Sequence, residues 1–289
     1  MPSAAPRRFR LSRAAPYLLM VPGLFWLLLF YVLPAAWMFV ISLSTGTLAT
    51  GFVLTGTLDA YVEGLTRFPV QFGNSLLYGG LATLFTFLIG FPVAYTIAFR
   101  GGRFKNLLLF LVIAPFFTSF LIRTISWKIL LGDQGPILGA LKDLDVLPPD
   151  FRILGSAIAV IAGITYNFLP FMILPLSVAL EKIDPYLIEA ANDLYANRFS
   201  ALRRVTVPLA LPGIFAGSLL TFIPAIGDFV TPDLLGGAET TTIAKVIQEL
   251  FLEGRDWPYG AALGFILMVI TLGGTLIALR PLRGEVVGS

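Results

Sequence analysis

The sequence contains no cysteine and no histidine among its 289 residues. Their absence excludes disulfide bonds, thiol nucleophiles, imidazole bases and zinc sites of the usual cysteine and histidine type. Charged residues are also scarce, at 13% of the chain. The formal net charge of +3 is too small and too dispersed to indicate nucleic-acid binding. What remains is a chain dominated by apolar residues, with a few local clusters of charge.

Apolar residues make up 57% of the sequence, and the mean hydropathy is +0.86. A soluble protein of this length needs a polar exterior and could not bury so much apolar surface. The composition therefore predicts an all-α integral membrane protein. The first apolar run, 17–41, follows four arginines as in a signal peptide. It is too long for a signal-peptide core and no small-residue cleavage site ends it, so we expect a retained spanning helix.

Six apolar stretches are long enough to cross a bilayer, which takes roughly 20 helical residues. We expect crossings at 17–41, 72–99, 106–130, 153–180, 209–228 and 259–280. Most basic residues fall in alternate connections, which the positive-inside rule assigns to the cytoplasm: Arg7, Arg8, Arg10, Arg13, Arg100, Arg103, Lys105, Lys182, Arg198, Arg203, Arg204, Arg280 and Arg283. Both termini are therefore expected in the cytoplasm, with a basic segment at 1–16, a six-helix domain at 17–280 and a tail at 281–289.

The connection at 181–208, between the fourth and fifth crossings, has the pattern of a docking helix. Asp184-Pro185 is a typical helix start. Glu189 and Asp193 lie four residues apart on one face. Apolar residues recur beside them at helical spacing: Leu187, Ala190, Ala191 and Leu194. Alanines permit close approach of another surface and carboxylates attract basic groups, although a merely solvated amphipathic helix would share this pattern.

Glu189-Ala190-Ala191 followed by Val205-Thr206-Val207-Pro208 resembles the EAA loop of permeases from binding-protein-dependent ABC importers. That pattern is E-A-A, three residues, Gly, nine residues, then I-x-L-P. Pro208 matches, and two valines replace the Ile and Leu. Tyr195 falls at the glycine, whose positive-φ turn tyrosine adopts only at a cost. We expect that the turn is rebuilt, or that Tyr195 continues the helix and packs on the partner.

This resemblance implies a type I importer permease with the MetI-like fold. In such permeases the loop docks in a groove of an ATP-binding subunit and transmits its closure as a rigid-body movement. The implied coupling residues are Glu189, Ala190, Ala191, Asp193, Leu194, Tyr195 and Pro208. The sequence has no G-x-x-x-x-G-K-[ST] phosphate loop, so we expect no enzyme activity and no cofactor in this chain, with ATP and Mg²⁺ on two partner subunits. One loop per chain implies a second permease, expected to be non-identical.

Other segments are similar to the spermidine/putrescine permease branch, and within it to the first of the paired permeases: 74–76, 116–135, 166–176, 226–237 and 255–258. The resemblance implies a permease of the bacterial inner membrane that imports polyamines delivered by a periplasmic binding protein. Two alternatives stay open. The same architecture serves other small cationic or zwitterionic solutes, such as amino-acid-derived or opine-like compounds. The second alternative is a secondary transporter that acts alone, and the docking loop disfavours it.

Polar residues within apolar crossings are candidates for a solute passage, because ammonium groups bind carboxylates and aromatic faces. Tyr166, Asn167 and Asp228 are such residues. Each has a structural alternative, as an interhelical hydrogen-bond partner or a helix cap. Asp233 and Trp257 are candidates for contact with the binding protein, or for loop structure.

Arg123 and Lys128 lie near the outer end of the third crossing, where a cationic lining would repel a polyamine. We expect them to reach the membrane interface or to pair with acids, and Asp133 is a suitable partner. The segment 240–257 has an amphipathic pattern with Ile243, Val246, Ile247 and Leu250 on one face. It is expected to pack on its own bundle or to dock the binding protein.

Overall fold

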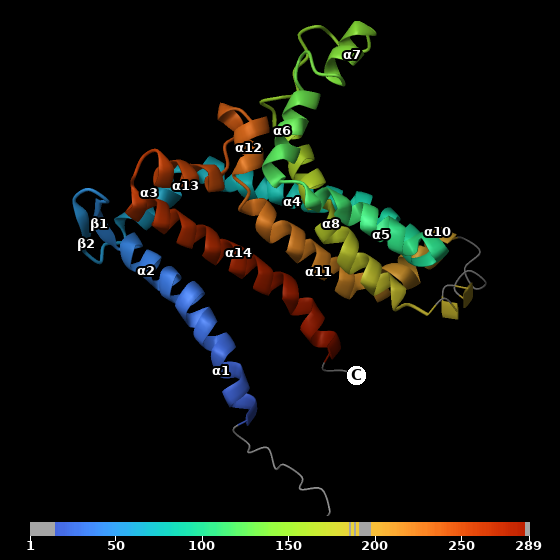
Figure 1. Ribbon diagram of the computed structural model, residues 1–289, viewed down its shortest axis with the longest axis horizontal. Coiled ribbons are helices and arrows are strands. Elements are labelled where there is room, and N and C mark those ends of the chain that lie inside the picture. Colours follow the sequence, from blue (N-terminus) through green and yellow to red (C-terminus); the bar gives the residue numbers. More distant parts are fainter. Residues whose placement is uncertain (1–14, 185, 188, 191–197, 287–289) are drawn as a thin grey trace, which may run out of the picture.

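The computed structural model describes residues 15–184, 186–187, 189–190 and 198–286. The structure is almost wholly helical, as predicted, with one short antiparallel hairpin of strands β1 (Ser44–Thr47) and β2 (Gly51–Leu54). Its long helices lie side by side in a bundle (Figure 1). They are α4 (Pro69–Arg100), α8 (Ala157–Glu181), α11 (Val207–Ile226) and α14 (Trp257–Val286).

Shorter helices connect the long ones and cover the ends of the bundle. The N-terminal span comprises α1 (Ala15–Leu27), a π-helical turn (Leu28–Val32) and α2 (Leu33–Ser42). The other short helices are α3 (Asp59–Arg67), α5 (Lys105–Ile113), α6 (Phe120–Leu130), α7 (Leu138–Asp143), α10 (Arg198–Ala201), α12 (Val230–Leu235) and α13 (Ile243–Leu252). Single turns of 3₁₀-helix lie at Gly102–Phe104, Ala114–Phe117 and Ala238–Thr240, and a π-helical turn lies at Leu202–Thr206.

Five helical segments of the described residues are long and apolar enough to cross a membrane. They are Leu19–Ser42, Pro69–Arg100, Ala157–Glu181, Phe199–Ile226 and Trp257–Leu276. Each overlaps a predicted crossing, but Phe199–Ile226 begins ten residues before the predicted start at 209, within the predicted connection 181–208. Helix α14 runs on through Val286, beyond the predicted end of its crossing at 280.

The predicted third crossing, 106–130, is not one continuous helix. Its two halves, Gly102–Phe117 and Phe120–Leu130, meet at an angle of 90°, so the chain has six spans only if this bent pair is one of them. Pro115 opens a 3₁₀ turn, and Thr118 is extended, with ψ 148°. Proline lacks an N–H and an extended residue breaks the helical hydrogen-bond ladder, which ends α5 before α6 begins.

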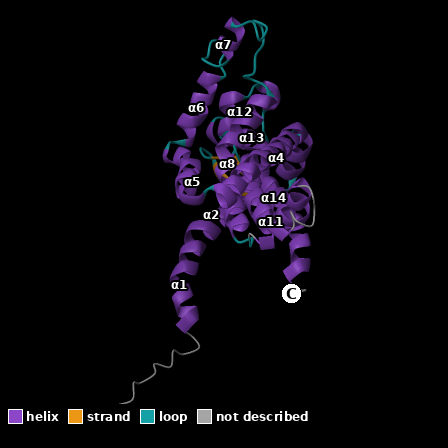
Figure 2. Ribbon diagram, turned by 90° about the vertical axis from the view of Figure 1, so that its right-hand side faces the viewer, coloured by secondary structure: helices purple, strands orange, loops and turns teal. Residues whose placement is uncertain are grey.

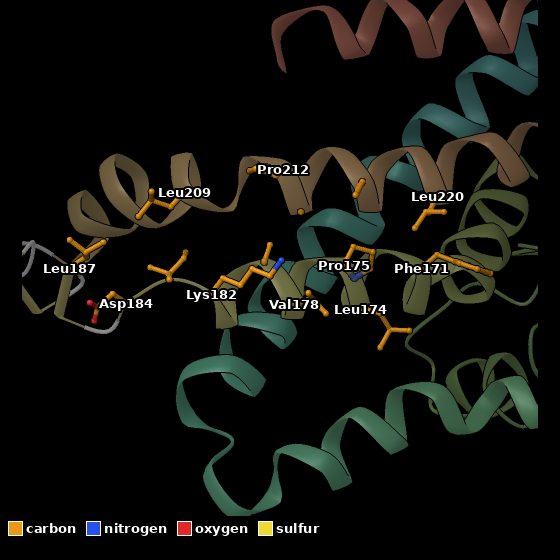
Figure 3. Close-up of a pocket in the computed structure, with 14 residues that line it drawn as sticks. Phe171, Leu174, Pro175, Val178, Lys182, Asp184, Leu187, Leu209, Pro212 and Leu220 are labelled. Carbon is orange, nitrogen blue, oxygen red and sulfur yellow. The ribbon is translucent and has the colours of Figure 1, made fainter. Parts of the chain in front are cut away.

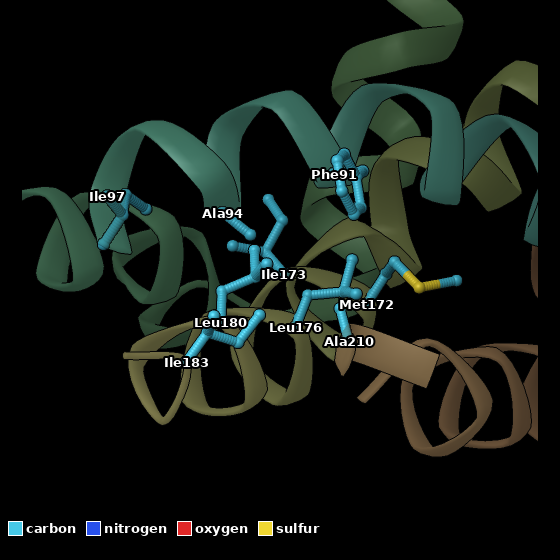
Figure 4. Close-up of a cluster of buried hydrophobic side chains, with 9 residues drawn as sticks. All are labelled: Phe91, Ala94, Ile97, Met172, Ile173, Leu176, Leu180, Ile183 and Ala210. Carbon is cyan, nitrogen blue, oxygen red and sulfur yellow. The ribbon is translucent and has the colours of Figure 1, made fainter. Parts of the chain in front are cut away.

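The core of the bundle is the contact of α8 with α4 and α11. Its buried apolar cluster consists of Phe91, Ala94, Ile97, Met172, Ile173, Leu176, Leu180, Ile183 and Ala210 (Figure 4). Gly90 lets the two backbones approach, since a Cβ there would lie 3.2 Å from both Ile173 and Met172 side chains. Small residues serve this purpose in membrane bundles, where close packing rather than water exclusion holds the helices.

Helix α13 fulfils the prediction made for 240–257, because its apolar face packs on its own bundle. Ile243 and Val246 are buried there, and Ile247 and Leu250 are partly buried. They contact residues of α4 and α14, namely Phe72, Tyr259, Leu263 and Ile266. By contrast, α6 projects from the bundle beside α12, and α7 lies beyond its far end (Figures 1 and 2).

Candidate functional site

A groove of about 830 Å³ runs between α8 and α11 and reaches the start of the 181–208 connection (Figure 3). Its lining is mostly apolar: Phe171, Leu174, Pro175, Val178, Ala179, Ile183, Leu187, Leu209, Pro212, Gly213, Ala216 and Leu220, with Lys182 and Asp184. Asp184 and Leu187 lie at one end, Phe171 lies at the other, and Lys182 lies between them (Figure 3). A force applied to the connection would therefore act directly on α8 and α11, the two helices that form the groove walls.

Two glycines bring α11 directly onto the backbone of α8. A Cβ at Gly213 would lie 2.3 Å from the Ala179 Cβ and 2.9 Å from the Pro175 carbonyl oxygen. A Cβ at Gly217 would lie 2.8 Å from the Met172 sulfur. Any larger residue at Gly213 would force the helices apart, so α8 and α11 pack as one unit along this wall of the groove.

The 181–208 connection places exposed residues at the end of this unit. The Asp184 carboxylate accepts a hydrogen bond from the backbone N–H of Tyr186 at 3.0 Å, as expected of the predicted helix start. Glu189 and Ala190 follow in helical conformation and are exposed. Pro208 lies at the second position of α11, directly after the π-helical turn Leu202–Thr206. The other predicted coupling residues lie outside the described residues: Ala191, Asp193, Leu194 and Tyr195.

An ion pair that the sequence pattern did not reveal ties α5 to the same end of α8. The Lys105 ammonium lies 2.8 Å from the Glu181 carboxylate, and both side chains are partly exposed. Such a pair is worth about 1 kcal/mol or less, so it positions the helix ends more than it stabilises them. Opposite charges at two predicted helix ends were the only signal in the sequence.

The candidate passage residues Asn167 and Asp228 belong to one buried polar network. The Asn167 side-chain N–H₂ donates to the Thr124 hydroxyl at 3.2 Å and to the Thr231 hydroxyl at 3.5 Å. The Thr231 hydroxyl in turn donates to Asp228. Asp228 also accepts from the backbone N–H groups of Val230 and Thr231, each at 3.0 Å, and so caps α12. The network joins α6, α8 and α12.

Asp228 lies just beyond the span Phe199–Ile226 and is 7% exposed. Burial raises the pKa of its carboxyl more than the hydrogen bonds from Thr231 and Val230 lower it. Tyr166 lies apart from this network. Its ring makes an edge contact with Trp127, at 5.4 Å between centroids, beside a separate apolar pocket of about 480 Å³. Asn167 thus acts as an interhelical hydrogen-bond partner and Asp228 as a helix cap, as in the structural alternatives. A role of Tyr166, Asn167 or Asp228 in a solute passage stays a prediction.

Comparison with known proteins identifies the kind of protein to which this groove and connection belong. Residues 86–280 match the family described as binding-protein-dependent transport system inner membrane component. The spermidine/putrescine transport system permease protein PotB of Haemophilus influenzae is 41% identical over 246 residues, covering 85% of this chain and 86% of that protein. PotB of Escherichia coli is 40% identical over 248 residues, covering 85% and 90%. The chain belongs to this permease family.

Solved structures support the same fold. A bacterial ABC transporter for the import of alginate contains a chain with a TM-score of 0.72 and 20% identity, covering 93% of this permease and 94% of that chain. A chain of the methionine ABC transporter MetNI has a TM-score of 0.59 and 19% identity, covering 78% and 98%. As a member of this family the permease is a non-enzymatic, membrane-spanning component of an ABC importer.

The candidate binding-protein contacts of the permease both have partners within the chain. Asp233 lies 3.0 Å from the Lys245 ammonium, and its side chain is half exposed. The Trp257 ring lies near those of Phe52 and Phe251, at 6.2 and 5.7 Å between centroids. Neither arrangement tests contact with a binding protein, because a side chain with a partner in its own chain can also contact another protein.

The expected partnership of Asp133 with Arg123 or Lys128 is wrong. Asp133 instead pairs with Lys142, at 3.4 Å, and with Arg152, at 3.1 Å. These two residues belong to the excursion between α6 and α8, which folds back on Asp133. Arg123 also does not extend outward, as is expected of a side chain that reaches the membrane interface. It is only 9% exposed, and its guanidinium lies over the Phe116 and Phe120 rings.

Proposed function

We propose that this permease forms part of an ATP-driven importer that takes up polyamines of the spermidine and putrescine type. The observation that carries the proposal is the 40–41% identity to permeases of spermidine/putrescine transport systems over 85% of this chain. Similarity of that extent covers the groove, the connection and the buried network together. The proposed subunit holds no cofactor, and ATP with Mg²⁺ binds to two partner subunits.

In the proposed assembly, both termini and the 181–208 connection face the cytoplasm. The distribution of basic residues supports this orientation. The exposed Glu189 and Ala190 dock on an ATP-binding subunit, whose closure pushes the connection. Because Gly213 and Gly217 lock α11 against α8, the push moves both walls of the groove together.

The remaining proposed partners are a second, non-identical permease and a periplasmic binding protein. One alginate transporter was solved in complex with a periplasmic protein, and its matching chain has a TM-score of 0.73 to this permease. Asp233 and Trp257 are proposed contacts for such a protein at the outer end. Tyr166, Asn167 and Asp228 are proposed to border the passage, with Asp228 supplying the negative charge that an ammonium group prefers.

ATP-dependent uptake into vesicles tests the proposal. The vesicles contain this permease, the neighbouring permease, the ATPase and the binding protein, and the solutes are labelled spermidine and putrescine. We expect uptake that stops without ATP and that only polyamines compete. ATP hydrolysis stimulated by the loaded binding protein without uptake of either polyamine would keep the importer and reject the cargo, in favour of another cationic or zwitterionic solute. Uptake by this chain alone would indicate a secondary transporter.

A further inference from the structure

Arg123 carries a positive charge that nothing in the described part of the chain neutralises. The residue is 9% exposed, and its Nε and Nη1 atoms are buried without hydrogen-bond partners. Its guanidinium carbon lies 5.0 Å from the centre of the Phe116 ring and 5.8 Å from that of Phe120. Arginine keeps its proton in proteins, so it cannot avoid the cost of burial by becoming neutral.

The carboxylates near α6 are already engaged by other groups. Helix α6 makes its main contacts with α12 and α8. Asp233 of α12 pairs with Lys245. Glu181 of α8 lies at the far end of that helix, about 21 Å from Asn167, and pairs with Lys105. Asp228, just before α12, accepts the hydrogen bonds of Val230 and Thr231. Asp133, just after α6, holds Lys142 and Arg152. In the described part of the chain these carboxylates leave no counter-charge for Arg123, and another molecule can supply one.

The surface next to Arg123 is aromatic, and part of it is exposed. The corner where α5 turns into α6, here called the aromatic corner, consists of Phe116, Phe117, Phe120 and Arg123. Phe117 is 78% exposed and Phe116 is 38% exposed. The corner lies at the 90° bend, from which α6 projects at the side of the bundle beside α12 (Figures 1 and 2). No other helix of the described chain covers Phe117, so a neighbouring molecule can approach the corner.

The depth of the aromatic corner within the membrane limits which molecules can contact it. The segment Gly102–Phe117 begins beside the basic residues Arg100 and Arg103 and has 16 residues, or about 24 Å at about 1.5 Å per residue. The hydrocarbon core of a bilayer is about 30 Å thick, so the corner lies within it. A water-soluble binding protein does not reach that depth, and a protein carboxylate there must come from a membrane-embedded subunit.

We infer that the aromatic corner is a docking surface for the second permease, which presents a carboxylate to Arg123. Phe116, Phe117 and Phe120 supply an apolar contact around the pair and exclude lipid and water from it, and the low dielectric strengthens the attraction. Pairing in the assembled transporter also explains how a buried, otherwise unsatisfied guanidinium is tolerated at membrane depth. The inference rests on the proposed function in one respect, the existence of a second permease.

Co-purification of the whole transporter tests the inference. A tag on this permease captures the second permease, with the ATPase and binding protein co-expressed, in a detergent that removes lipid. We expect Arg123→Gln to lower the captured second permease roughly tenfold or more, because it removes one partner of a buried charge pair. Arg123→Lys should retain most of it. The matched control is Lys128→Gln, which removes an exposed charge from the same helix and should change nothing.

A charge-reversal selection keeps the test decisive if Arg123→Gln lowers the yield of the tagged chain itself. Arg123→Glu should be rescued by an acidic residue changed to lysine or arginine in the second permease. Wild-type capture by Arg123→Gln would overturn the inference, as would capture that depends only on added anionic lipid, since a lipid phosphate would then be the counter-ion. These outcomes concern assembly, whereas failure of polyamine uptake by an intact complex would reject only the proposed cargo.

Discussion

Replacement of Gly213 by alanine tests how closely α8 and α11 pack along the groove. The added Cβ would lie 2.3 Å from the Ala179 Cβ, 2.9 Å from the Pro175 oxygen and 3.5 Å from the Leu176 Cα. Carbon atoms attract best at about 3.5–4.0 Å, so the helices must separate by about 1 Å. Backbone atoms and a Cβ cannot rotate away, which leaves no side-chain adjustment to relieve the contact.

The expected magnitude is the difference between two glycine-to-alanine changes. A Cβ added at Gly80 of α4 would have nothing within 4 Å, so Gly80→Ala gains only the helix propensity of alanine, about 0.8–1.0 kcal/mol. Gly213→Ala has the same propensity gain but also overpacks the α8–α11 contact, which typically costs about 1–3 kcal/mol. We therefore expect Gly213→Ala to be less stable than Gly80→Ala by about 1–3 kcal/mol.

Equilibrium unfolding in mixed micelles, followed by tryptophan fluorescence, measures this difference for the two purified variants. The reconstituted transporter gives a second readout, because separated groove walls should weaken the coupling of ATP hydrolysis to uptake. Equal unfolding free energies for Gly213→Ala and Gly80→Ala would refute the close packing, and with it the argument that α8 and α11 move as one unit.

Two further changes separate docking from packing. Glu189→Lys reverses a charge on an exposed residue, so it should leave the unfolding midpoint unchanged but abolish ATP hydrolysis stimulated by the binding protein; normal stimulation would contradict a coupling role. Asn167→Ala removes hydrogen bonds to Thr124 and Thr231 and should lower the unfolding free energy by about 0.6–1.7 kcal/mol in the same micelles. Tyr166→Phe is the neighbouring control, and equal stability of the two would show that the network does not hold α6 to α8.

The straight spans could be predicted from the sequence because each is a long apolar run. The spans of α4, α8 and α14 agree with the predicted crossings, since uniform apolarity alone determines them. The bend between α5 and α6 could not be predicted in the same way. Residues 116–122 are mostly apolar, and Thr118 and Ser119 are short enough to fit in a helix. Pro115 was the one visible signal, but other prolines of this chain lie inside continuous helices, such as Pro170 and Pro175 of α8.

In the candidate functional site, too, local features could be predicted from the sequence and contacts between distant segments could not. The helix start at Asp184 depends on neighbouring residues, so it could be predicted from the sequence. Pro208 did not mark the start of the fifth span, which already begins at Phe199. The partners of Asp133 depend on how residues 131–156 fold back, and local spacing says nothing about that. The same holds for the network of Asn167, whose partners Thr124 and Thr231 come from two distant helices. Hydroxyl groups inside apolar helices are too common to indicate which of them will meet.

Helix α8 connects the buried polar network around Asn167 with the 181–208 connection. Asn167 lies 14 residues before Glu181, or about 21 Å along the helix at about 1.5 Å per residue. Pro170 and Pro175 lie between them, and each lacks the N–H that would continue the hydrogen-bond ladder, so α8 alone would bend under a push on the connection. Gly213 of α11 packs on the Pro175 carbonyl and braces α8 where its own ladder is interrupted. We therefore expect a push at Glu189 to reach Asn167 as a shift of α8 with α11, rather than as a bend absorbed at the prolines.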